Sequence, residues 1–122
     1  MASLGVRGRR SGRTIWFPVV ITEFGDDRYL VAMLGPGTNW VRNLSAAHGR
    51  AVLRHGRSEP VRLEPVDTAD RAPILRSYLR VAPGARPHFP IDRDAPLAEF
   101  ERIAADFPVF RIESQGVNGP AM

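Results

Sequence analysis

The sequence of 122 residues contains no cysteine and no lysine. Without cysteine there is no disulfide framework, no thiolate nucleophile and no cysteine ligand for a metal. No window approaches the roughly 20 apolar residues that a membrane span needs, and the N-terminus lacks the apolar core of a signal peptide. We therefore expect a cytoplasmic protein with no membrane-spanning segment.

Acidic residues are missing from the first 22 positions, whereas four of the 17 arginines lie between residues 7 and 13. A net charge of +4 is compatible with nucleic acid, anionic lipid or a small polyanion as partner. However, the arginines form no long block, and no helix-turn-helix, zinc-finger or ribonucleoprotein-type aromatic motif is present. The charge pattern favours a small anionic ligand over nucleic acid.

The basic segment from Arg7 to Thr14 leads directly into the apolar run Ile15 to Ile21. Gly8 and Gly12 allow unusual backbone conformations and a close approach of a ligand, and Ser11 supplies a hydroxyl donor. Amide hydrogens and guanidinium groups that converge at such a turn bind phosphate or carboxylate. The alternative interpretation is a solvated basic hairpin turn without a ligand.

The length predicts one domain, residues 1–113, followed by a flexible tail, residues 114–122. Alternating apolar residues between glycine-rich turns predict about six short, mainly antiparallel strands, and apolar residues at helical spacing predict three helices. The strands are expected at 4–7, 14–24, 28–34, 50–54, 58–66 and 108–113, and the helices at about 39–47, 67–79 and 97–107. We expect a mainly β fold, a small barrel with short helices packed outside.

Two segments carry more specific expectations. Both alternating sets of the strand 14–24 are largely apolar, which predicts burial on both faces. Pro18 cannot donate a ladder hydrogen bond and should lie at a sheet edge or bulge. The stretch from Val81 to Pro96 is too rich in proline for regular structure, and Pro73 should bend or split the helix after Asp67.

Three motifs and their order resemble the deazaflavin-dependent nitroreductase family. These proteins are split-barrel oxidoreductases of actinobacteria that use coenzyme F-420. The matching residues are the turn 8–13 before a strand that holds Pro18, the segment Tyr29-Leu30-Val31-Ala32, and the helix segment Asn39-Trp40-Val41-Arg42-Asn43-Leu44. The closing segment 108–112 matches as well, so the resemblance covers nearly the whole chain and implies a split β-barrel.

The resemblance also implies a cofactor site. In the family the basic turn holds the phosphate and acidic tail of the deazaflavin, and two strands and a Trp-x-x-Asn helix lie against its ring. The implied cofactor-binding residues are Arg9, Arg10, Ser11, Gly12, Arg13, Pro18, Val19, Ala32, Trp40 and Asn43. A flat apolar slot suits the ring and a cationic mouth suits the tail.

The expected reaction passes a hydride from the reduced cofactor to an unsaturated or nitro-bearing small organic acceptor. The residues expected at the substrate pocket are Trp40, Tyr78, Arg86, His88 and Phe89. No side chain is assigned as catalytic, because solvent, Tyr78 or His88 could each supply the proton. Many relatives have a basic residue at the position of Ile15 and some have a lysine near Gly35; this chain has neither. Tyrosines that nitro-drug-activating members carry in the loop 82–89 are also missing.

Alternatives remain open from the sequence. A split-barrel enzyme that uses FMN would bind its phosphate at the same turn, and a non-catalytic carrier of a cofactor or small apolar ligand would need no acceptor. The alternative role of Trp40 is that of a core residue, and the alternative role of Asn43 is a structural hydrogen bond. No histidine and carboxylate cluster has metal-ligand spacing. The chain is expected to be a monomer or a homodimer.

Overall fold

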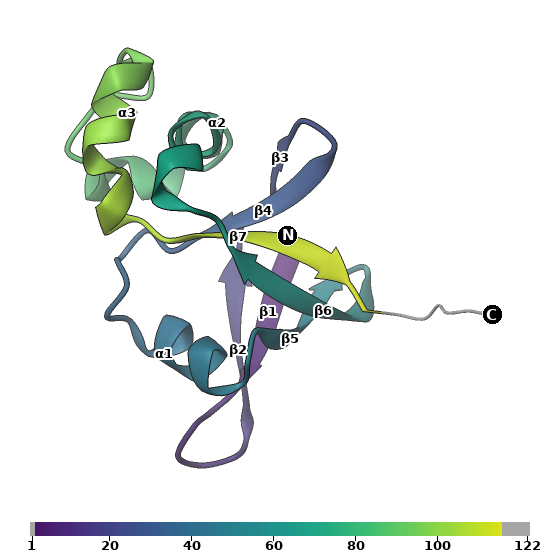
Figure 1. Cartoon of the computed structure of the whole chain (residues 1–122). Coiled ribbons are helices and arrows are strands. Elements are labelled where there is room, and N and C mark those ends of the chain that lie inside the picture. The colour runs from purple at the N-terminus through teal and green to yellow at the C-terminus, as the bar shows by residue number, and fades with distance from the viewer. Residues whose placement is uncertain (1, 116–122) are drawn as a thin grey trace.

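A computed structural model describes residues 2–115, which form one seven-stranded antiparallel sheet with short helices (Figure 1). The strand order is β2-β1-β5-β6-β7-β4-β3. The sheet curls into a half-barrel, so β2 and β3 remain as its two edges. The strands are β1 (Ala2–Arg7), β2 (Thr14–Val19), β3 (Thr22–Phe24), β4 (Asp27–Val31), β5 (Arg50–His55), β6 (Arg57–Pro65) and β7 (Val109–Ser114).

The helices occupy two places around the sheet. Helix α1 (Asn39–Ala46) lies beside the turn between β1 and β2, and α2 (Ala72–Val81) and α3 (Leu97–Ile103) pack together on the opposite side of the molecule (Figure 1). Short 3-10 helices lie before α2, at η1 (Thr68–Asp70), between α2 and α3, at η2 (Pro83–His88), and after α3, at η3 (Ala104–Asp106). None of the helices in residues 2–115 has the length and apolar character required to cross a membrane.

Strand alternation divides the apolar residues between two cores. On β4 and β7, Leu30 and Phe110 face the barrel interior, whereas Val31 and Val109 face α2 and α3. Because successive side chains of a strand point to opposite faces, these two strands are buried on both sides. Helices α2 and α3 therefore cover the outside of β4 and β7, as predicted for short helices outside a barrel, whereas α1 packs against the interior cluster through Trp40 and Leu44.

The predicted fold class is confirmed, with differences at particular elements. The expected strand 14–24 is two strands, because the chain breaks at Val20 and Ile21 between β2 and β3. The expected burial of both its faces is wrong: Ile15 is 48% and Trp16 39% exposed. Strand β2 is an edge strand on which Ile15 and Trp16 are exposed whereas Phe17 packs against Trp40 of α1, and Pro18 lies on that edge, as expected.

The proline-rich segments are more regular than the sequence predicts. Part of the stretch from Val81 to Pro96 forms η2, so the expectation of no regular structure there is wrong. Pro73 lies in the first turn of α2, where its missing N–H breaks no hydrogen bond, and the helical region is split just before it. Ser114 ends β7 and the Gln115 N–H donates to the Pro60 carbonyl at 3.0 Å. The rest of the expected tail, 116–122, lies outside the described residues.

Candidate functional site

The turn between β1 and β2 is closed by its own backbone. The N–H of Gly8 donates to the carbonyl of Arg13 at 2.7 Å, and the N–H of Gly12 donates to the carbonyl of Gly8 at 2.9 Å. Gly12 has φ +75°, a conformation that side-chain-bearing residues rarely adopt. The two glycines thus fold the arginine-rich segment into a compact loop.

Ser11 helps to hold this loop. Its Oγ accepts a hydrogen bond from the N–H of Arg13 at 3.1 Å, and a Cβ added to Gly8 would lie only 2.8 Å from that oxygen. Gly8 is therefore needed for the close approach of Ser11, and the serine hydroxyl hydrogen is still available to an acceptor. The Arg13 side chain is exposed and does not line the pocket described next.

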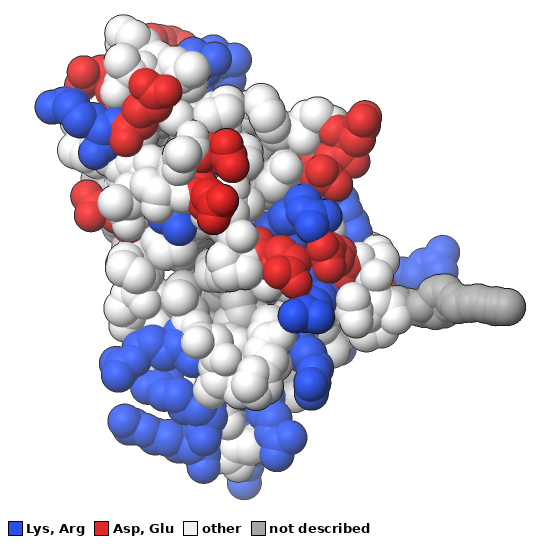
Figure 2. All heavy atoms as spheres, viewed as in Figure 1, with Lys and Arg blue, Asp and Glu red and all other residues white. Residues whose placement is uncertain are grey.

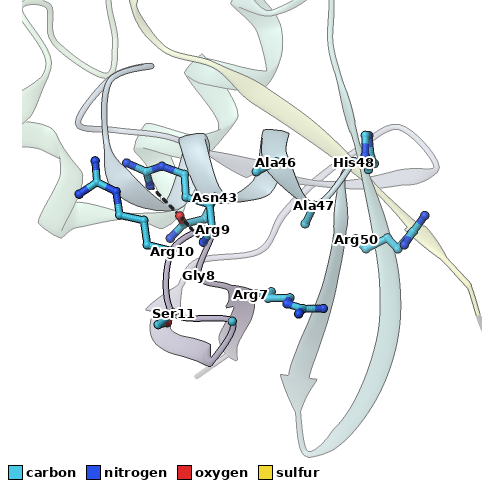
Figure 3. Close-up of a pocket in the computed structure, with 11 residues that line it drawn as sticks. Arg7, Gly8, Arg9, Arg10, Ser11, Asn43, Ala46, Ala47, His48 and Arg50 are labelled. Carbon is cyan, nitrogen blue, oxygen red and sulfur yellow. Dashed lines mark hydrogen bonds between the residues drawn. The ribbon is translucent and has the colours of Figure 1, made fainter.

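Arg9 connects the turn to α1. Both its backbone N–H, at 3.1 Å, and its Nη1, at 2.7 Å, donate to Oδ1 of Asn43 (Figure 3). Asn43 is 5% exposed, so the bond to the cationic guanidinium is largely shielded from water. The amide nitrogen of Asn43 and the other guanidinium hydrogens of Arg9 are left for a ligand.

A pocket of about 650 Å³ opens beside this connection. We call it the arginine pocket. In Figure 3 the side chains of Arg9 and Arg10 lie at its left and His48 and Arg50 at its right. No carboxylate lines it. The lining residues are Arg7, Gly8, Arg9, Arg10, Ser11, Gly12, Asn43, Ala46, Ala47, His48 and Arg50.

The charge distribution of the whole molecule follows this pocket. Figure 2 shows arginines gathered at the lower end, where Figure 1 places α1 and the β1–β2 turn, whereas carboxylates lie on the upper and middle parts. Side chains with one sign of charge around a concave surface concentrate the field and attract ions of the opposite sign. The arginine pocket is therefore suited to an anion.

A second pocket, of about 740 Å³, is mainly apolar. We call it the apolar pocket. It joins β2, at one edge of the sheet, to β4, next to the other edge, and so lies where the curled sheet fails to close. The lining residues are Phe17, Pro18, Val19, Val20, Leu30, Val31, Met33, Leu34, Thr38, Asn39, Trp40, Tyr78, Val81, Ala82, Pro83, Gly84 and Ala85.

Helix α1 contributes to both pockets. Trp40 lines the apolar pocket and Asn43, three residues later, lines the arginine pocket. Residues at this spacing lie on the same face of a helix. The Trp40 ring packs between two phenylalanine rings. Its centre lies 5.4 Å from that of Phe17 and 5.6 Å from that of Phe110. One helical face thus borders both the cationic arginine pocket and the apolar pocket.

Tyr78 is the one titratable side chain in the lining of the apolar pocket. It lies on α2 and is 5% exposed. Burial raises the pKa of its hydroxyl to about 12, because the charged phenolate is poorly solvated there. Tyr78 therefore remains a neutral hydrogen-bond donor at physiological pH.

Five predicted site residues line neither pocket: Arg13, described above, and four more. Ala32 is fully buried, and its N–H donates to the carbonyl of Pro108 at 2.9 Å. Arg86 donates from Nε to the Leu79 carbonyl at 3.0 Å and so caps the end of α2. Phe89 stacks on Phe107 in the helical core with ring centres 4.0 Å apart, and His88 is exposed.

Ala32, Arg86, His88 and Phe89 line neither the apolar pocket nor the arginine pocket. The segment that reaches the pocket is instead 81–85, because the Arg86 cap and the Phe89 stack hold the following residues against α2 and the helical core. Arg9, Arg10, Ser11, Gly12 and Asn43 line the arginine pocket, and Pro18, Val19, Trp40 and Tyr78 line the apolar one.

The sequence interpretation missed several lining residues. In the arginine pocket these are Arg7, His48 and Arg50, which long-range pairing of β1 with β5 brings to one side. His48 has φ +57°, an unusual conformation that follows from the tight chain reversal after α1. In the sequence, the position of His48 just before Gly49, at the end of a predicted helix, was the feature that indicated a chain reversal there. No group of three or more histidine or acidic residues within 2–115 is arranged to hold a metal ion.

Comparison with known proteins supports the fold. No family model matches the chain, and no curated protein sequence does. Among solved structures, a protein of unknown function from Agrobacterium tumefaciens superposes with a TM-score of 0.64 at 15% identity, over 94% of this chain and 48% of the other. An F-420-H2-dependent reductase gives a TM-score of 0.55 at 20% identity, over 92% of both chains.

A FAD-binding protein from Mesorhizobium loti gives a TM-score of 0.52 at 16% identity, over 94% of this chain and 80% of the other. These structures share the split-barrel fold with the present chain. Identities this low establish the architecture alone.

Proposed function

We propose that this protein is an oxidoreductase that binds a flavin-like cofactor, and that this cofactor is coenzyme F-420. The observation that carries the proposal is the placement of Trp40 and Asn43 on one face of α1, bordering an apolar and an arginine-lined pocket. A cofactor that joins a flat ring to an anionic chain would match these two pockets, the ring in the apolar one and the chain in the arginine-lined one. The split-barrel neighbours described as an F-420-H2-dependent reductase and a FAD-binding protein support it.

The residues present fit such a group. Arg9, Arg10 and the donors of the Ser11–Gly12 turn would hold the anionic part, with the amide nitrogen of Asn43 as a further donor. Pro18, Val19 and Trp40 would bound the ring with apolar surface. When bound in its reduced form, the cofactor would supply a hydride to an unsaturated or nitro-bearing acceptor.

The number of cations favours the deazaflavin over FMN. Four arginines line the arginine pocket, whereas FMN carries a single phosphate. The longer acidic tail of coenzyme F-420 would pair with more of them. The protein's own contribution to the reaction would be binding and orientation, since no described side chain in either pocket is a carboxylate or a thiol and Tyr78, with a pKa of about 12, is a weak acid. Solvent would then supply the proton.

A titration tests the proposal. Oxidised coenzyme F-420 and FMN are each added to the purified protein and followed by fluorescence, and the reduced form of the tighter ligand is then mixed with an enone and a nitroarene. We expect tighter binding of coenzyme F-420 and consumption of an acceptor faster than without protein. Tighter binding of FMN would reassign the cofactor. Binding without consumption of any acceptor would favour a carrier.

A further inference from the structure

The apolar pocket is free of formal charge in its lining. Its polar side chains are the hydroxyls of Thr38 and Tyr78 and the amide of Asn39. The Thr38 hydroxyl already donates to the Gly35 carbonyl at 3.2 Å. Tyr78 carries no charge at physiological pH, because the pKa of its hydroxyl, raised by burial to about 12, lies far above that pH. A ligand in this pocket meets neutral donors and hydrocarbon.

Nearby arginines do not supply the positive charge that the lining of the apolar pocket lacks. Arg42 is exposed on α1 and lines neither pocket, and Arg86 is engaged with the carbonyls of Leu79 and Arg80. The arginine pocket shares no lining residue with the apolar pocket. The structure thus separates the surface that attracts anions from the surface that accepts apolar rings.

From this separation we infer that the apolar pocket selects an uncharged acceptor and rejects the matching carboxylate. The inference rests on the proposed function in taking this pocket of about 740 Å³ to hold the acceptor beside the cofactor ring. Moving an unpaired charge from water into an apolar site is strongly unfavourable, whereas a neutral carbonyl or nitro oxygen needs only one donor. The hydroxyl of Tyr78 and the amide nitrogen of Asn39 are the side-chain donors that the pocket offers. The substrate class is therefore a neutral, ring-sized molecule with a carbonyl or nitro group.

A matched pair of ligands tests the inference without any cofactor. Methyl 4-nitrobenzoate and 4-nitrobenzoate differ in one charge, and a nitroarene quenches tryptophan fluorescence. In a Trp16→Phe variant the remaining tryptophan is Trp40, which lines the pocket. We expect the ester to bind at least about tenfold more tightly than the acid, because only the acid must lose the hydration of a carboxylate.

The acid could also bind among the arginines, so each titration is repeated with Arg9→Ala and Arg10→Ala added. The preference for the ester should persist or increase in this background. An acid that binds there as tightly as the ester would overturn the inference. The inference would also be overturned if the ester and the acid bind with comparable affinity while Arg9 and Arg10 are present, and if removing the two arginines leaves both affinities unchanged.

A charge placed at the pocket supplies the positive test. Leu34 is 62% exposed and lines the apolar pocket, so Leu34→Arg adds a cation there without disturbing the core. Phe24→Arg is the matched control, because Phe24 is also exposed and lines neither pocket. We expect the ester-to-acid preference to fall several-fold in Leu34→Arg alone. An equal fall in both variants would contradict selection by the pocket.

This experiment separates two kinds of failure. Because the cofactor is absent, the ester preference is measured whether or not coenzyme F-420 binds. Loss of the preference with intact cofactor binding would overturn charge selection and leave the oxidoreductase proposal standing. A clear preference in a protein that binds neither coenzyme F-420 nor FMN would overturn the oxidoreductase and keep the neutral-ligand pocket.

Discussion

Oδ1 of Asn43 accepts two hydrogen bonds from Arg9, one from its backbone N–H at 3.1 Å and one from Nη1 at 2.7 Å. The two residues are 34 positions apart, so this contact fixes the β1–β2 turn against α1. The same oxygen therefore sets both the backbone of the turn and the direction of one of its guanidinium groups.

Replacing Asn43 should separate structural from binding effects. Asn43→Ala removes an acceptor from a shielded N–H and a cation, which should lower the free energy of unfolding by about 1–3 kcal/mol. Asn43→Asp keeps an acceptor for Arg9 but adds a negative charge to the arginine pocket. It should retain most of the stability and still weaken anion binding.

Thermal unfolding and binding of coenzyme F-420 measure these two effects. Ser45→Ala, at an exposed position on the same helix, is the control and should change neither. Anion binding by Asn43→Asp as tight as that of the unaltered protein would remove Asn43 from the site.

The arginine pair should govern cofactor affinity. Arg9→Ala with Arg10→Ala should weaken binding of coenzyme F-420 by at least about tenfold, because charge-assisted hydrogen bonds to the anionic tail are lost. Affinity should also fall as salt rises, since charges at an exposed pocket are screened. Titrations at two ionic strengths test both effects.

The control for this pair is Arg57→Ala with Arg80→Ala, which removes the same charge from exposed positions outside both pockets. An equal loss of affinity in the control would attribute binding to net charge rather than to the arginine pocket.

Trp40→Ala should cut turnover more than cofactor affinity. The indole lies between Phe17 and Phe110 and lines the apolar pocket, so its loss removes a wall against which an acceptor is positioned. The variant should also be less stable by about 2–4 kcal/mol, because a large ring is removed from a packed site. Trp40→Phe keeps an aromatic wall and should recover most of both properties.

Turnover of an enone, the dissociation constant of the cofactor and the melting temperature are compared for the three proteins at a temperature where all are folded. A turnover number that is the same for all three would exclude Trp40 from acceptor positioning.

Tyr78 should make stability depend on alkaline pH. Burial raises the pKa of its hydroxyl from 10.0 to about 12 in the folded protein. Below pH 10 both states keep the proton and the full stability is present; between pH 10 and 12 the unfolded chain releases its proton first, so stability falls. The loss should be about 2 kcal/mol over this window.

Tyr78→Phe cannot release a proton, so its stability should fall less steeply above pH 10 than that of the unaltered protein. Urea unfolding at a series of pH values measures the difference. Parallel curves for the two proteins would show that the Tyr78 hydroxyl is solvated in the folded state.

Two glycines with the same φ form a matched pair for stability. Gly49 and Gly56 both have φ +83°, but a Cβ on Gly49 would lie 2.8 Å from the Leu63 carbonyl, whereas nothing lies within 4 Å at Gly56. Gly56→Ala should cost about 1–2 kcal/mol from the backbone conformation alone. Gly49→Ala should cost about 1–3 kcal/mol more, since the contact is with a fixed strand.

Chemical denaturation of both variants gives the comparison. Equal losses of stability in the two variants would mean that β6 moves away from residue 49 at no cost. The 2.8 Å hydrogen bond from the Leu63 N–H to the carbonyl of residue 49 should then be absent in Gly49→Ala.

Local patterns in the sequence were enough to predict the hairpins and α1. A hairpin is determined by residues close together in the sequence. The structure has turns at Gly25 and Gly56, between the predicted strands of alternating apolar residues. The exposure of Trp16 was not predictable in this way, because an apolar strand has the same pattern whether or not a helix covers its outer face. Only the strand order makes β2 an edge.

The candidate site also has residues that local sequence predicts and residues that depend on long-range contacts. The arginine turn is local, and its residues were identified from their order in the chain. Arg50, in contrast, joins the arginine pocket through the pairing of β5 with β1, and Arg86 leaves the apolar pocket because it caps the preceding helix. Both outcomes depend on contacts between elements, for which single residues give no signal.

Strand edges are where one protein chain can add to the sheet of another, and a half-barrel keeps two of them. Here β3 has only three residues, and β2 carries Pro18, which has no N–H to offer to an incoming strand. The residue that forms a wall of the apolar pocket thus also interrupts the hydrogen-bonding row along that edge. This barrel can stay open to a small molecule with little risk of fibre-like association through β2.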